Sequence, residues 1–69
     1  MYDTYHLDTE ARRLIDVGAL GIGIDDYERL SARKSDNTKV LLAARANTLG
    51  GPRLENAAER YVTLLALVE

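Results

Sequence analysis

The sequence lacks the covalent and metal-based devices that stabilise many very small domains. Its 69 residues include no cysteine, which excludes disulfides and thiolate metal sites, and only one histidine, which argues against a structural zinc site. A chain of this length buries only about 60% of its unfolded surface and lies near the lower limit of stability. We therefore expect a single small domain over residues 1–69 that gains stability by association with itself or with another protein.

The apolar residues of the chain are those that pack well in helices. Leucine, isoleucine, valine and alanine dominate, whereas there are four tyrosines, one proline and no phenylalanine or tryptophan. No segment approaches the ~20 consecutive apolar residues that span a bilayer. The N-terminal stretch MYDTYHLDTE is acidic and polar, unlike a secretory signal. These features favour a helical, cytoplasmic protein.

Apolar residues recur at helical spacing in four segments. They predict an all-α, compact bundle of short helices at about 8–17, 26–34, 38–49 and 52–68. The predicted caps are Asp8 or Thr9 for the first helix and Asp25, paired with Glu28, for the second. Gly18 is the predicted left-handed residue that ends the first helix.

Each predicted helix has an apolar face that we expect to turn inward. The first two carry Leu7, Ala11, Leu14 and Ile15, then Tyr27 and Leu30. The third carries Val40, Leu41, Ala44 and Leu49, and Leu42 and Ala43 widen its apolar arc. Gly50, Gly51 and Pro52 separate it from the fourth helix, whose stripe is Leu54, Ala57, Ala58, Tyr61, Leu65 and Val68.

The glycine-rich stretch GALGIGIDD, residues 18–26, does not match a known ligand loop. Its glycine spacing differs from that of a dinucleotide loop, and Asp25 and Asp26 stand where a phosphate loop needs lysine and a hydroxyl. No side-chain oxygen lies between Asp16 and Asp25, which argues against a calcium loop. We interpret the stretch as a helix connection whose Leu20 and Ile22 either pack under the bundle or contact a partner.

Catalysis and cofactor binding have little support in the sequence. His6 lies near Asp3, Asp8 and Glu10, but these groups do not share one helical face and stand close to a chain end. No nucleophile, base and orienting group form a plausible set. We expect no enzyme activity, no cofactor and no metal.

Charge is distributed unevenly along the chain. Residues 1–28 carry seven acidic and two basic side chains, a net of −5, whereas residues 29–53 carry six basic and one acidic, a net of +5. The basic segment supplies a candidate patch for an acidic protein or a nucleic acid: Arg29, Arg33, Lys34, Lys39 and Arg45. An acidic region facing a neighbour's basic region would favour head-to-tail association.

The fourth predicted helix ends in YVTLLALVE, which is apolar on nearly every side. Such a helix must be buried all round, and a domain of this size has little material to surround its own last helix. Leu64 and Leu67 are therefore expected either to meet another chain or to cover the second helix. The complete candidate protein interface is Leu64, Leu67, Tyr61, Leu20 and Ile22.

Two functions follow as hypotheses. The first is a non-catalytic protein–protein interaction module, a small modulator, inhibitor or accessory subunit that self-associates or docks on a larger assembly. The alternative is a regulator resembling a helix-turn-helix, which presents a basic face from residues 29–45 to DNA. An overall net charge of −2 and the apolar third helix favour the first.

Overall fold

The computed structural model describes residues 4–49 and 53–67. Four helices form nearly all of this part of the chain: α1 (Thr4–Asp16), α2 (Ile24–Ala32), α3 (Asp36–Leu49) and α4 (Leu54–Leu67). The predicted all-α bundle of four helices is therefore confirmed. The predicted boundary at residues 50–52 and the inward position of Val68 lie outside the described residues.

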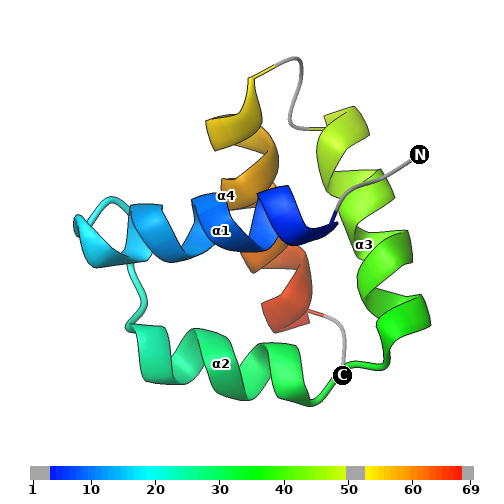
Figure 1. Ribbon diagram of the computed structural model, residues 1–69, viewed down its shortest axis with the longest axis horizontal. Coiled ribbons are helices and arrows are strands. Elements are labelled where there is room, and N and C mark those ends of the chain that lie inside the picture. Colours follow the sequence, from blue (N-terminus) through cyan, green and yellow to red (C-terminus); the bar gives the residue numbers. More distant parts are fainter. Residues whose placement is uncertain (1–3, 50–52, 68–69) are drawn as a thin grey trace.

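The last helix is the centre of the bundle. α4 packs most extensively against α3 and α1 and also contacts α2, whereas α2 and α3 are not among the closely packed pairs. Figure 1 shows α1 crossing α4, with α3 beside it and α2 along the lower edge. α4 thus buries Tyr61, Val62 and Leu65 within its own chain, whereas Leu67 is exposed, so the domain surrounds one side of its last helix and not the whole of it.

Backbone geometry explains where α1 ends. Gly18 has φ +78°, and its N–H donates to the Ile15 carbonyl while the Ala19 N–H donates to the Leu14 carbonyl at 2.8 Å. This pair of bonds is a Schellman motif, which satisfies the last carbonyls of the helix. The terminating role predicted for Gly18 is confirmed.

The predicted helix starts are wrong by a few residues. Asp8 and Thr9 cap nothing because α1 already includes residues 4–7. α2 begins directly after Gly23, which is its N-cap residue and makes no side-chain cap bond, so Asp25 lies in the first turn. A carboxylate there is still favourable, because it faces the positive end of the helix dipole.

The helix that was expected to begin at about residue 38 begins at Asp36. Ser35 Oγ accepts a hydrogen bond from the Thr38 N–H at 3.2 Å, and the Ser35 carbonyl accepts one from the Lys39 N–H at 3.0 Å. Ser35 therefore fulfils the capping role that its residue type favours.

The core is small and rich in alanine. Its members are Leu7, Ala11, Leu14, Ile15, Tyr27, Leu42, Ala43, Ala46, Ala57, Ala58, Tyr61, Val62 and Leu65. Five of these 13 side chains are alanines, which let helices approach closely but bury little apolar area each. The predicted inward residues of α1 and the inward position of Tyr27 are confirmed, whereas Leu54 is exposed.

Candidate interaction surface

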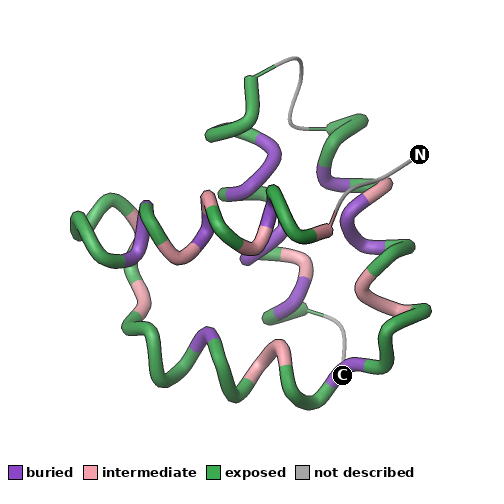
Figure 2. Tube along the Cα trace, viewed as in Figure 1, coloured by how far each residue is buried: buried purple, intermediate pink, exposed green. Residues whose placement is uncertain are grey.

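The main departure from the sequence prediction is the orientation of α3. Leu42, Ala43 and Ala46 face the core, whereas Val40 and Leu41, predicted to face inward, are 47% and 70% exposed. Leu49 is 55% exposed. α3 packs against α4 through its small side chains, because alanine allows closer backbone approach than leucine or valine. Figure 2 shows buried stretches of α3 on the side toward α1 and α4, alternating along the helix with exposed stretches.

We call the exposed set Val40, Leu41, Arg45 and Leu49 the α3 face. Leu41, Arg45 and Leu49 are spaced four residues apart and therefore lie along one side of the helix. Arg45 is exposed and makes no ion pair with another described residue. The α3 face is thus an apolar strip with one available positive charge at its middle.

The five cations of the predicted basic patch occupy different environments. Arg29 forms an ion pair with Asp26, and Lys34 is only 9% exposed. Lys39 is half-buried, whereas Arg33 and Arg45 are exposed. Because of this pairing and burial, fewer cations of residues 29–53 are exposed and unpaired than the composition of the segment indicates.

Exposed acidic residues gather where α1 meets α2. We call Asp16, Val17, Ile24 and Asp25 the acidic tip. Asp16 and Asp25 are exposed and make no ion pair within the described part of the chain, and Val17 and Ile24 are 63% and 40% exposed. In Figure 1 the connection between α1 and α2 lies at the end of the molecule opposite α3.

The residues predicted to form an apolar interface differ in burial. Leu20, Ile22 and Leu64 are half-buried and pack against the core, which matches the interpretation that they cover their own chain. Tyr61 is 2% exposed and belongs to the core, so its ring is not available to a partner in this structure. Leu67 is 70% exposed at the end of α4.

A polar cluster joins α1 to α2. The Tyr27 hydroxyl donates to Asp8 Oδ1 at 2.5 Å, and Arg12 donates to Asp8 at 3.0 Å and to Glu28 at 3.2 Å. The Arg12 guanidinium carbon lies 5.3 Å from the centre of the Tyr27 ring. Burial, reinforced by the bond to Asp8, raises the pKa of Tyr27 well above its ordinary value. These contacts hold α2 against α1.

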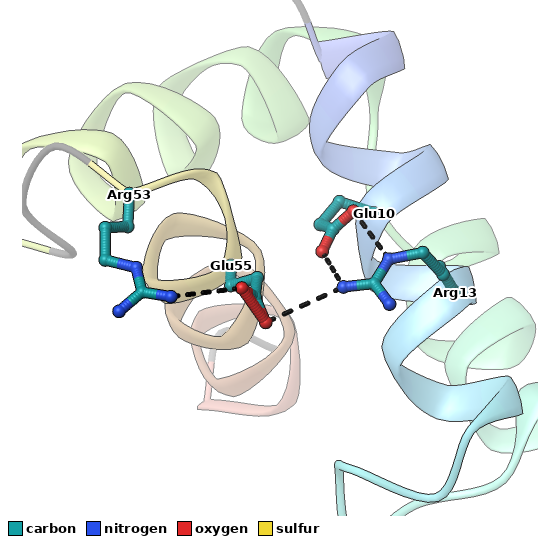
Figure 3. A network of polar contacts seen from close by, with 4 residues as sticks. All are labelled: Glu10, Arg13, Arg53 and Glu55. Atoms are coloured by element: carbon teal, nitrogen blue, oxygen red, sulfur yellow. Dashed lines mark hydrogen bonds and ion pairs between the residues drawn. The ribbon is translucent and has the colours of Figure 1, made fainter.

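A second network joins α1 to the start of α4, as Figure 3 shows. Arg13 donates to both carboxylate oxygens of Glu10, at 2.9 and 2.5 Å, and lies 3.6 Å from Glu55. Arg53 lies 3.3 Å from the same Glu55. The hydrogen bonds from Arg13 lower the pKa of Glu10 below its ordinary value. The network is exposed, and exposed pairs contribute only about 0–1 kcal/mol each.

Two hollows on the molecule are lined mainly by polar side chains. One, of about 290 Å³, lies between α3 and α4 and is lined by Leu49, Asn56, Glu59, Arg60 and Thr63. The other, also about 290 Å³, involves all four helices and is lined by Thr4, Asp8, Arg12, Ser31, Asp36, Lys39 and Tyr61. Two cations and two carboxylates line the second hollow, so its charges balance.

Within residues 4–49 and 53–67, no three His, Asp or Glu side chains are placed to hold one metal ion. No described helix is long and apolar enough to cross a membrane. The chain matches no protein-family model, and neither a curated protein nor a solved structure shows significant similarity to it.

Proposed function

We propose that this chain is a non-catalytic protein–protein interaction module, a small modulator or accessory subunit, that binds its partner through the α3 face. The observation that carries the proposal is the exposure of Val40, Leu41 and Leu49 on a helix whose opposite side is already buried. Apolar side chains grouped on a surface are typical of a contact site, because their removal from water favours association. The proposed compartment is the cytoplasm, as expected from the sequence.

The α3 face is small, but it combines apolar and charged side chains as protein interfaces do. Apolar groups supply burial, and Arg45 supplies a charge that selects among partners. At about 25 cal/mol per Å² of apolar area, such a strip supports only modest affinity on its own. The partner must therefore contribute a complementary charge or a second contact.

The DNA-binding alternative has less support from the geometry. A helix-turn-helix needs its two helices packed against each other so that the second is held in the groove. Here α2 packs on α4 and α1 rather than closely on α3. Arg45 also stands among apolar neighbours, which offer bases and phosphates few hydrogen bonds.

Site-specific photo-crosslinking tests the proposed face. Benzoylphenylalanine is placed at position 41 and, in a matched control, at position 67, because Leu41 and Leu67 are both 70% exposed. The chain is irradiated as purified protein and in an extract of its source cells. We expect a discrete adduct, with itself or with another protein, from position 41. Arg45→Glu, introduced into the same chain, should weaken that adduct, because Arg45 lies one helical turn from position 41 on the α3 face.

Two results would contradict the proposal. If position 41 gives no discrete adduct, or one that Arg45→Glu leaves unchanged, the α3 face is not the binding surface. If only position 67 gives such an adduct, the interface lies at the end of α4, as the sequence predicted for Leu67.

A further inference from the structure

We propose that the partner of the α3 face is a second copy of this chain, which presents its acidic tip, so that copies associate head to tail. This inference rests on the proposed function of the α3 face and adds the identity of its partner. It follows from charge, from the matching apolar residues and from the positions of the two surfaces.

The two surfaces are complementary in charge after internal pairing is taken into account. Asp26, Glu28 and Glu10 already have arginine partners within the chain. Asp16 and Asp25 remain available at the acidic tip, and Arg45 remains available on the α3 face. Complementary exposed charges steer encounter and set the register of a contact.

Apolar residues accompany the charges on both surfaces. Val17 and Ile24 flank the acidic side chains of the tip, and Val40 and Leu41 precede Arg45 on the α3 face. Contact between the tip of one copy and the α3 face of another would therefore bury aliphatic groups while pairing arginine with aspartate. Burial strengthens the ion pair because it excludes water and salt.

A symmetric pairing of two α3 faces is less favourable. In an antiparallel pair that matches Leu41 of one copy with Leu49 of the other, Arg45 lies at the midpoint. It would then face Arg45 of the partner subunit, and like charges opposed across a contact are destabilising. When the acidic tip faces the α3 face instead, aspartate lies opposite Arg45 and the two charges attract.

The two surfaces lie at opposite ends of the molecule in Figure 1. Each copy therefore keeps one unused surface after it forms a contact, and further copies add to both ends. An interface between different patches of this kind gives a chain of subunits, or a ring when the rotation closes. The expected product is a concentration-dependent series of oligomers and not a discrete dimer.

The test uses two variants that each lack one surface. The tip variant is Asp16→Lys with Asp25→Asn, which leaves the α3 face intact and places a cation at the end of α1, where the helix dipole favours it. The face variant is Leu41→Glu with Arg45→Glu, which leaves the tip intact. Arg33→Gln is the control, because Arg33 is exposed directly after α2 and belongs to neither surface.

Sedimentation velocity over a concentration series, up to about 1 mM, registers contacts with a Kd of about 1 mM or tighter. We expect oligomers from the wild-type chain and from Arg33→Gln, and monomers from each surface variant alone. An equimolar mixture of the two variants should form a 1:1 heterodimer that grows no further, because it joins the one intact tip to the one intact face. Circular dichroism establishes that all variants remain helical.

Each alternative outcome overturns a specific statement. A wild-type chain that stays monomeric, or a mixture that forms no heterodimer, refutes head-to-tail association while leaving the α3 face open to a different protein. A tip variant that assembles like the wild type shows that another surface meets the α3 face. A face variant that assembles normally refutes the α3 face itself, and with it the proposed function.

Discussion

At the scale of single residues, local backbone and hydrogen-bond chemistry explains several positions fully. Gly18 is the clearest case, because its φ of +78° lies in the left-handed region that side chains with a Cβ disfavour. Gly21 offers the contrast: a Cβ added there meets no heavy atom within 4 Å, and the residue has no left-handed backbone. Two glycines of one loop thus have different roles.

We predict that Gly18→Ala lowers the free energy of unfolding by about 1–2 kcal/mol, the cost of a left-handed conformation for alanine. Gly21→Ala should change it little or raise it slightly, because alanine restricts the unfolded chain. Urea unfolding followed by circular dichroism measures both. Equal effects of the two substitutions would show that the Schellman motif does not depend on Gly18.

The two buried tyrosines differ in how their hydroxyls are bonded. Tyr27 donates to Asp8, whereas Tyr61 makes no side-chain hydrogen bond with another described residue. Burial raises the pKa of both phenols, and the Asp8 charge adds to the effect. The folded chain therefore keeps Tyr27 protonated at a pH where the unfolded chain ionises it.

This linkage predicts loss of stability in alkali. Because the folded-state pKa of Tyr27 is raised, its contribution is present below about pH 10 and declines above it, by about 1.4 kcal/mol per pH unit. Tyr27→Phe should reduce that slope. At neutral pH the same variant should cost about 1.5 kcal/mol for the lost bond to a carboxylate, and Tyr61→Phe should cost less. Urea titrations at several pH values test the slope, and an unchanged alkaline slope in Tyr27→Phe would contradict this origin.

At the scale of elements, α4 supports the other three helices. Its inner residues Ala57, Ala58, Tyr61, Val62 and Leu65 are buried because α1, α2 and α3 all contact this helix. In α3, by contrast, apolar residues lie on the exposed side of the helix as well as on the buried side. An apolar residue on a helix is therefore not by itself a core residue in this protein.

Two leucines of α4 provide a matched test of this statement. Leu65 is fully buried and Leu67 is 70% exposed, two positions apart on the same helix. Leu65→Ala should cost about 2–5 kcal/mol, the usual range for a buried leucine, and unfold much of the population of so small a domain. Leu67→Ala should cost less than about 0.5 kcal/mol. Thermal unfolding distinguishes them, and similar melting temperatures would disprove the central position of α4.

At the scale of the whole molecule, internal pairing redistributes the charge that the sequence displays. Networks around Arg12 and Arg13 use carboxylates of α1, α2 and α4. Asp16 and Asp25 remain available at one end of the bundle and Arg45 remains available on α3; Arg33, Asp36, Glu59 and Arg60 are further exposed charges that form no ion pair with a described residue. The acidic tip and the α3 face therefore carry opposite charge even though the net charge of the chain is only −2.

We predict that self-association weakens as salt is added. The charges at the acidic tip and the α3 face are exposed, and the screening length falls from about 30 Å at 0.01 M to about 3 Å at 1 M salt. The mean molar mass by light scattering should therefore decrease with ionic strength at constant protein concentration. A mass that is independent of salt would indicate an assembly held by apolar contact alone.

The sequence by itself determined the helical class, the number of helices, the ending at Gly18 and the inner face of α1. These depend on local chemistry, namely hydrophobic period, turn residues and the conformational freedom of glycine. The caps of α1 and α2 were misplaced by a few residues, because several acidic and hydroxyl residues near each start satisfy the same pattern.

Only the tertiary structure decided which side of α3 is buried and which charges remain exposed. Apolar residues surround α3, so its period points to no single face, and the alanines Ala43 and Ala46 became the inner side because they fit closest to the neighbouring helices. Leu42, Ala43 and Ala46 have the spacing of one helical side, but Leu41, Arg45 and Leu49 have such a spacing too, so the sequence favoured neither side. Arg45 lies among exposed leucines of α3, and Asp16 and Asp25 lie where α1 meets α2, at the opposite end of the molecule. These positions depend on contacts between distant segments, which local sequence does not encode.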